Sequence, residues 1–298
     1  MVRMHTFSIV AADPQAAEWG VAVASKFLAV GAVVPWATAG AGAVATQAWA
    51  NLSHGPEGLR LLGEGLSADE VVRRLTDADQ GRDHRQLGVV DARGRAASYT
   101  GGACLAWAGG RTGDRYACQG NLLAGPEVVS AMAKAFEAGA GRPLPERLLA
   151  ALEAGQHAGG DRRGQQSAAL YVVKEGGSYG GYLDRYVDLR VDDDPQPIAK
   201  LRELLLLHRL YFGTTDPARL VRLTPEVVAE IQAILGTAGF YRGPVSGAYD
   251  EATRQAFRAW ASVENFEERW RDDDVADGEV LAFLRRRFGS PQRRGPTA

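Results

Sequence analysis

Residues 20–52 form a long stretch in which Lys26 is the only charged side chain. A stretch of this length and composition raises the question of a membrane-spanning helix. Pro35 and several glycines interrupt it, however, and these residue types break a helix into shorter pieces. We therefore predict that the stretch folds as short, buried β-strands, with one cation set into an apolar sheet.

A hydroxyl-bearing strand is predicted just ahead of this stretch. Residues 6–10 contain the β-favouring side chains of a short strand, and residues 20–25 read as the strand that returns after a turn. A hairpin of this kind brings Ser25 and Lys26 back to the level of Thr6. The three side chains are therefore expected at one end of the sheet.

The order of the later segments predicts the fold class. Strand signals and helix signals alternate in groups, with two helices after the first group of strands and two more after the second. The predicted strands cover residues 30–36, 42–49, 87–90, 96–99, 116–119, 168–173 and 182–191, and the predicted helices cover 56–62, 67–75, 126–138 and 144–154. This order suits an α+β fold in which two packed sheets are covered by helices on both outer faces.

Residues 192–197 (DDDPQP) give the clearest boundary signal, because neither a charge run nor two prolines can continue a strand. A leucine-rich helix is predicted over 198–212. Leucines on so many of its faces imply burial between domains or subunits, so we expect a homo-oligomer. The expected parts are a first domain (1–194), a linker helix (195–222), a small three-helix domain (223–288) and a disordered tail (289–298).

Five ordered sequence blocks resemble one known family. The chain looks like a member of the domain of unknown function number 1028 family, which is usually placed among the N-terminal nucleophile hydrolases. The blocks are TFSIVA (6–11), GVAVAS (20–25), VATQAW (44–49), QGNL (119–122) and GGDRRGQQSAAL (159–170). The resemblance implies a four-layer αββα sandwich and an amidohydrolase activity.

The resemblance assigns the nucleophile role to Thr6. A free α-amine has a pKa near ~7.7–8.0, so an amine on the nucleophile's own residue can accept the hydroxyl proton. In this family the threonine commonly follows the initiator methionine, whereas residues 1–5 precede it here. His5 is bulky enough to prevent simple methionine removal even if Met4 starts the chain, so Thr6 would be masked unless these residues are cleaved off.

Lys26, Gln47 and Asn121 are the other candidate catalytic residues. Lys26 lies either close to Thr6, where its charge would lower the pKa of the hydroxyl or the amine, or at a sheet edge in water. The amides of Gln47 and Asn121 stand at the ends of apolar strands. There, each either donates to a developing oxyanion or satisfies a turn.

Four residues are candidates for substrate binding. Ser25 shares the placement of Lys26 at the end of the predicted hairpin. Asp161, Arg162 and Arg163 occupy a glycine-bounded loop, in which an arginine held by Asp161 would bind a substrate carboxylate with both arms of its guanidinium. The alternative for this loop is a surface position with ordinary salt links.

Residues 223–288 resemble the peptidoglycan-binding three-helix module. The pattern includes Val228, Ile231, Gln232 and Leu235, followed by a glycine- and aromatic-rich segment over 239–257. Ala261 replaces the middle glutamine of the module. The resemblance implies a glycan or a protein as the partner of this domain.

Other classes of function find little support in the composition. The net charge of −2 and the absence of a basic stripe do not predict nucleic-acid or membrane binding. The histidines and the two cysteines, Cys104 and Cys118, lack metal-ligand spacing, so we expect no metal and no cofactor. The first residues lack an apolar secretory core, so we expect a cytoplasmic protein.

We therefore predict an amidohydrolase that cleaves a small amide or amino-acid-derived substrate through Thr6. The alternative is a binding or interaction protein on the same fold, with its nucleophile masked by residues 1–5. A third interpretation places the nucleophile at Ser8, Ser25 or Cys118.

Overall fold

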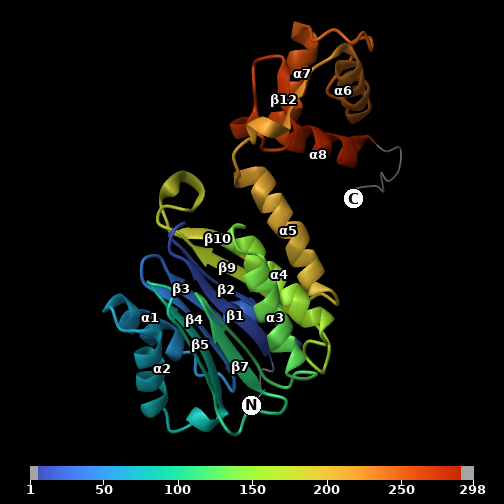
Figure 1. Ribbon diagram of the computed structural model, residues 1–298. Coiled ribbons are helices and arrows are strands. Elements are labelled where there is room, and N and C mark those ends of the chain that lie inside the picture. Colours follow the sequence, from blue (N-terminus) through green and yellow to red (C-terminus); the bar gives the residue numbers. More distant parts are fainter. Residues whose placement is uncertain (1–5, 290–298) are drawn as a thin grey trace. The chain divides into compact units, whose positions relative to one another are not determined.

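The computed structural model describes residues 6–289 (Figure 1). The chain forms two compact units that divide between Leu205 and Leu206. Residues 1–5 and all but the first residue of the predicted tail lie outside the described part, and the predicted domain bounds stay predictions. Within residues 6–289, no helix combines the length and the apolar character needed to cross a bilayer.

Two antiparallel sheets form the centre of the first unit. The first sheet has the strand order β10 (Arg185–Val191), β9 (Ser167–Val173), β2 (Glu18–Ser25), β1 (Thr6–Asp13), β8 (Tyr116–Gly120) and β7 (Gly109–Gly113). The second has the order β3 (Pro35–Thr38), β4 (Gly42–Ala48), β5 (Arg85–Asp91) and β6 (Ala96–Thr100). The two sheets face each other across an apolar layer of valines and alanines.

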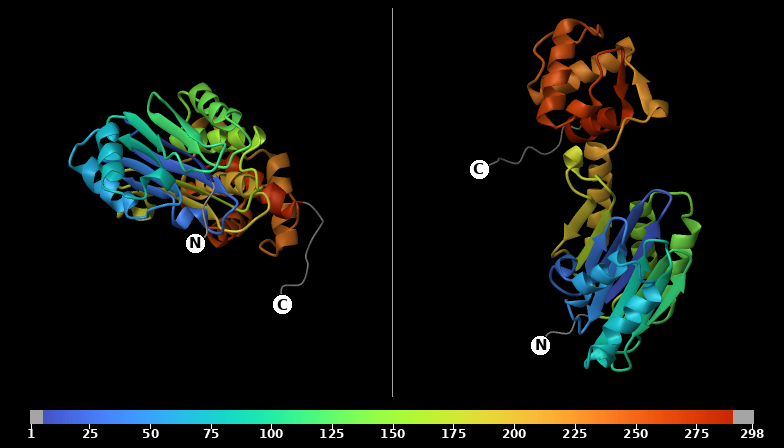
Figure 2. Two further views of the ribbon diagram at one scale, coloured as in Figure 1. Left: turned by 90° about the horizontal axis from the view of Figure 1, so that it is seen from below. Right: turned by 90° about the vertical axis from the view of Figure 1, so that its left-hand side faces the viewer.

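Helices cover both outer faces of the paired sheets (Figure 1 and Figure 2). Helices α1 (His54–Gly63) and α2 (Ala68–Asp77) pack on the four-stranded sheet. Helices α3 (Glu127–Ala138) and α4 (Leu144–His157), with the first turns of α5 (Pro197–Phe212), pack on the six-stranded sheet. The predicted α+β class and its four αββα layers are confirmed.

Strand β1 shows how the sequence builds two layers at once. Its side chains alternate, as those of any strand do. Phe7 and Ile9 lie in the apolar layer beneath the helices, whereas Val10 and Ala12 lie in the layer between the sheets. A strand buried on both faces in this way has to be apolar almost throughout, which explains the composition of this part of the chain.

The predicted strand over 30–36 is wrong in its first half. Residues Val30–Ala32 form a 3₁₀ turn, and β3 begins only at Pro35. Ala29 has a left-handed backbone (φ 52°), and the amide of Val30 donates to the side chain of Ser167 at 3.0 Å. A distant hydroxyl therefore satisfies a backbone group that a strand neighbour would otherwise take.

The second unit contains the three predicted helices. These are α6 (Pro225–Ala238), α7 (Glu251–Val263) and α8 (Gly278–Phe288), and a short ladder of β11 (Leu220–Arg222) and β12 (Val275–Asp277) accompanies them. Fully buried Gln232 accepts from the amides of Ser246 and Gly247 at 2.9 Å each and donates to Thr253 at 2.8 Å. One side chain thus fixes the segment that joins α6 to α7.

Candidate functional site

The space between the two sheets changes from apolar to polar toward one end. Each contributing strand carries apolar inward side chains along most of its length and a polar one at this end. We call the polar group the inter-sheet cluster; it consists of Thr6, Ser8, Ser25, Gln47, Gln86, Gln119 and Asn121, none more than 2% exposed. The antiparallel register brings these strand ends together, because it pairs Thr6 with Ser25, Ser8 with Gln119 and Gln47 with Gln86.

Thr6 is the first residue of β1 and lies fully buried in the cluster. Its hydroxyl lies 3.2 Å from the hydroxyl of Ser25, as the predicted hairpin requires. Its carbonyl accepts from the backbone amide of Asn121 at 3.1 Å and from the side chain of Gln47 at 3.4 Å. The backbone and the hydroxyl of Thr6 are therefore each held by separate partners.

Gln86 connects the two sheets at this end. Its carbonyl oxygen accepts from the side-chain amides of Gln47 at 2.8 Å and Asn121 at 2.9 Å. Its own amide donates to the carbonyl of Gly120 at 2.7 Å and to the hydroxyl of Thr100 at 2.9 Å. The two candidate amides are thus engaged by a residue that the sequence analysis did not select.

A second chain of hydrogen bonds passes through Ser8. Gln119 donates to the Ser8 hydroxyl at 2.7 Å, and Ser8 donates to Gln47 at 2.6 Å. The buried Oε1 of Gln119 has no hydrogen-bond partner in the described part of the chain. A Cβ on Gly88 would lie 2.3 Å from this oxygen, so Gly88 leaves the room that the Gln119 amide occupies.

Backbone strain accompanies two of the candidate residues. Ala48, directly after Gln47, has φ 67°, and Leu122, directly after Asn121, has φ 52°. Left-handed backbone is costly for residues other than glycine and collects at functional sites. At both positions the strand ends and the chain turns away just after it has placed its amide in the cluster.

Asp161 fixes the predicted substrate-binding loop. It is 4% exposed, and its carboxylate accepts from the Arg163 guanidinium at 2.7 Å and from the backbone amide of Lys26 at 3.1 Å. It also pairs with Leu123 as a β-bridge. Asp161 therefore ties this loop to the end of β2, beside Ser25, and binds the edge of the Arg163 guanidinium that carries Nε and Nη2.

Lys26 and Arg162 are both exposed. The ammonium group of Lys26 donates to the carbonyl of Gln165 at 3.3 Å, and the backbone amide of Arg162 donates to Leu122 at 3.1 Å. Of the two placements considered for Lys26, this geometry corresponds to the sheet edge in water. The ammonium group of Lys26 therefore lies against the loop that carries Arg163.

Cys118 faces away from the cluster, into the layer beneath α3 and α4. Burial raises the pKa of its thiol far above the ordinary value. A thiol held protonated is a poor nucleophile, so Cys118 does not suit the role of nucleophile.

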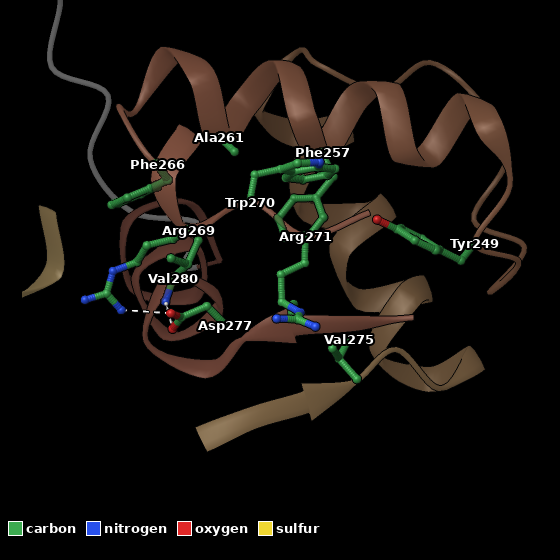
Figure 3. A pocket seen from close by; sticks show the side chains of 11 residues that line it. Tyr249, Phe257, Ala261, Phe266, Arg269, Trp270, Arg271, Val275, Asp277 and Val280 are labelled. Atoms are coloured by element: carbon green, nitrogen blue, oxygen red, sulfur yellow. Dashed lines mark hydrogen bonds and ion pairs between the residues drawn. The ribbon is translucent and has the colours of Figure 1, made fainter. Parts of the chain in front are cut away.

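The second unit contains a small cavity of ≈ 10 Å³ (Figure 3). Aromatic side chains and the buried ion pair of Arg269 with Asp277, at 2.8 Å, line it. This volume holds about one water molecule, so the cavity does not accommodate a sugar ring.

Comparisons with known proteins identify two segments. A family model described as a family of unknown function (DUF1028) matches residues 6–201, and one described as a candidate peptidoglycan-binding domain matches residues 211–284. The crystal structure of protein SPO2555 from Silicibacter pomeroyi, to which the DUF1028 model is also assigned, is 35% identical to this chain with a TM-score of 0.62. That match covers 69% of this chain and 89% of the other. No curated protein matches the chain.

Proposed function

The chain belongs to the family of unknown function DUF1028, and from this premise we propose that its first unit is an amidohydrolase with Thr6 as nucleophile. The position of Thr6 carries the proposal. It begins a central strand of a four-layer αββα sandwich, and its hydroxyl lies 3.2 Å from that of Ser25. The family match also begins at this residue, with residues 1–5 ahead of it.

The reaction requires a free amine on Thr6. In the intact chain this nitrogen belongs to a peptide bond with His5, and an amide nitrogen has no lone pair available to accept a proton. Removal of residues 1–5 produces the amine. The amine then takes the hydroxyl proton while Oγ1 attacks the substrate carbonyl carbon, and a C–O bond forms.

The tetrahedral intermediate collapses when its C–N bond breaks. The leaving nitrogen takes the proton from the Thr6 ammonium and departs as an amine, which leaves an ester on Oγ1. Water attacks this ester while the α-amine accepts one proton from it. The C–Oγ1 bond then breaks, Oγ1 takes the proton back from the ammonium, and the carboxylic acid is released. Atoms and protons balance over the two halves, and the chain is regenerated.

The surrounding residues support these steps by position. Ser25 orients the Thr6 hydroxyl, and the bonds from Asn121 and Gln47 to the Thr6 carbonyl fix the peptide plane beside the new amine. Arg163, held by Asp161, suits a substrate carboxylate, and Lys26 and Arg162 add positive charge at the margin. We propose a small, acidic or amino-acid-derived amide as the substrate class.

Intact-mass measurement of the protein purified from its native host tests the premise of the mechanism. We expect the mass of a chain that lacks residues 1–5.

A recombinant chain in which methionine directly precedes Thr6 provides the matched form, because methionine is readily removed before a small residue. This form should hydrolyse members of an amide library, including acidic ones. An intact leader with no hydrolysis by either form would favour the binding protein with a masked Thr6.

The second unit has a separate candidate function, because it matches the peptidoglycan-binding model over residues 211–284. Phe257 and Trp260, which could stack on a sugar, instead stack on each other with centroids 5.7 Å apart, and Trp260 is fully buried. Ala261 is also buried, on the same helix. We propose a protein partner for this unit rather than peptidoglycan.

We therefore expect no saturable retention of the full chain on purified peptidoglycan in a sedimentation assay. The control is a chain that ends at residue 205, which should sediment to the same small extent. Strong retention that disappears on this truncation would contradict the proposal and favour a glycan ligand.

A further inference from the structure

A cleft of ≈ 300 Å³ lies on the outer helical layer of the first unit. It is lined by α1, by α2 and by the segments that precede α1 and follow α2, among them Asn51, His54, Glu57, Arg74 and Leu75. None of its lining residues belongs to the inter-sheet cluster. Small-molecule sites in proteins begin at about this volume.

The inner wall of the cleft is a partly buried polar group centred on Asp79. Arg85 donates to its carboxylate at 2.8 Å, and the backbone amide of Gly81 does so at 2.8 Å. The Arg85 guanidinium lowers the pKa of Asp79 to about 2, so this carboxylate is ionised at neutral pH. The charge of Asp79 is thus matched within the wall.

His54 is 3% exposed, and its Nε2 lies 3.2 Å from Asp79 Oδ2 and 3.2 Å from the Asn51 amide nitrogen. Burial lowers the pKa of His54, which favours the neutral ring at neutral pH. The Nδ1 atom of His54 is buried and has no hydrogen-bond partner among the described residues. Because Nε2–H faces the Asp79 carboxylate, Nδ1 is left as a hydrogen-bond acceptor that the fold does not use.

The two arginines that line the cleft differ in how they are engaged. The guanidinium of Arg60 is bound by Glu57, at 2.9 and 2.7 Å, and by Glu64. Arg74 donates only its Nε, to Glu70 at 3.0 Å, and its two terminal amino groups have no partner among the described residues. These two groups form the fork that binds a carboxylate in bidentate fashion.

Leu61 and Leu75 add an apolar component and are 3% and 4% exposed. We propose that this cleft is a binding site for a small carboxylic acid with a short apolar group. The carboxylate binds the terminal amino groups of Arg74, and the short apolar group contacts the leucines. The proposal is independent of any catalytic role of Thr6.

Titration of the full chain with 3-methylbutanoate tests the proposal. The readout is the ring signal of His54 in ¹H–¹³C spectra, assigned by its loss in His54→Gln. We expect a saturable shift of this signal. The isosteric neutral amide, 3-methylbutanamide, should bind at least about tenfold more weakly, because a bidentate bond to a charged acceptor is lost.

Arg74→Leu and Arg73→Leu form a matched pair. Both arginines lie exposed on α2 and both bind Glu70, at 3.0 and 2.7 Å, but only Arg74 lines the cleft. Arg74→Leu should weaken binding of the acid at least about tenfold, and Arg73→Leu should leave it within about twofold. No saturable shift, equal effects of the two variants, or equal binding of the acid and the amide would each overturn the proposal.

Discussion

Replacement of Thr6 by alanine is expected to lower amide hydrolysis at least about 10³-fold in a chain that begins at residue 6. The substitution removes the only atom that attacks the substrate in the proposed mechanism. It removes the side-chain hydrogen bond to Ser25 at 3.2 Å, so the fold should persist. Turnover of the best substrate from the amide library, with circular dichroism as a check of folding, measures the effect.

Two variants distinguish the loss of the attacking hydroxyl from a disturbance of the residues around it. Thr6→Ser keeps the hydroxyl and should stay within about tenfold of the parent chain, because only a methyl group is lost. Ser8→Ala removes a neighbouring hydroxyl from the same face of β1; it should lower stability, because Gln119 and Gln47 each lose a buried hydrogen bond, but it should keep hydrolysis because the attacking oxygen remains. Hydrolysis that survives Thr6→Ala and disappears in Ser8→Ala or Ser25→Ala would move the nucleophile to that serine.

The pH dependence of amide hydrolysis follows from the proposed base, which is the α-amine of Thr6. A free α-amine with a pKa near ~7.7–8.0 accepts the hydroxyl proton only when it is unprotonated. The rate should therefore rise with pH through this range and level off above it. A rate independent of pH between 6 and 9 would contradict an amine base.

The parts of the site that could be predicted from the sequence depend on local pairing. A hairpin joins segments close together in the chain, so its turn fixes the register and places Ser25 opposite Thr6. The amides of Gln47 and Asn121 could be found by their position at strand ends. Each of these signals needs only a few neighbouring residues.

The parts that could not be predicted depend on how the two sheets stack. Gln86 binds Gln47 and Asn121, which lie 39 and 35 residues away in sequence. Nothing in the local pattern of an apolar strand shows which distant side chain it will face. The signal that was present is a glutamine at the start of the apolar segment 87–90, because a strand buried on both faces has no solvent for such a side chain.

Two elements of the fold also depend on contacts that the local sequence does not show. The segment around Val30 has the composition of a strand, but the hydroxyl of Ser167 binds its backbone and a 3₁₀ turn forms. Strand β7 (Gly109–Gly113) has few β-favouring residues and exists because it pairs with β8 at the sheet edge. In both places, tertiary contacts outweigh local propensity.

Gln86→Leu is expected to lower the free energy of unfolding of the first unit by about 3–5 kcal/mol. Leucine fits the volume but neither donates nor accepts a hydrogen bond. The side-chain amides of Gln47 and Asn121 and the carbonyl of Gly120 would each lose a partner inside a fully buried layer. Loss of a buried hydrogen bond with nothing to replace it costs about 1–3 kcal/mol, and three such losses outweigh the added apolar contact.

The free energy of unfolding of the first unit alone is measured by denaturant titration, with hydrogen exchange in peptides from β4 and β5 as the readout. Gln166→Leu is the matched control, because the Gln166 side chain makes one exposed hydrogen bond, to Asp193 at 3.0 Å, and should change stability by no more than about 0.5 kcal/mol. Equal effects of the two substitutions would mean that the inter-sheet layer admits water or repacks when Gln86 is lost. Such a layer would not hold the Thr6 carbonyl rigidly, since Gln47 binds this carbonyl through the side chain that Gln86 holds.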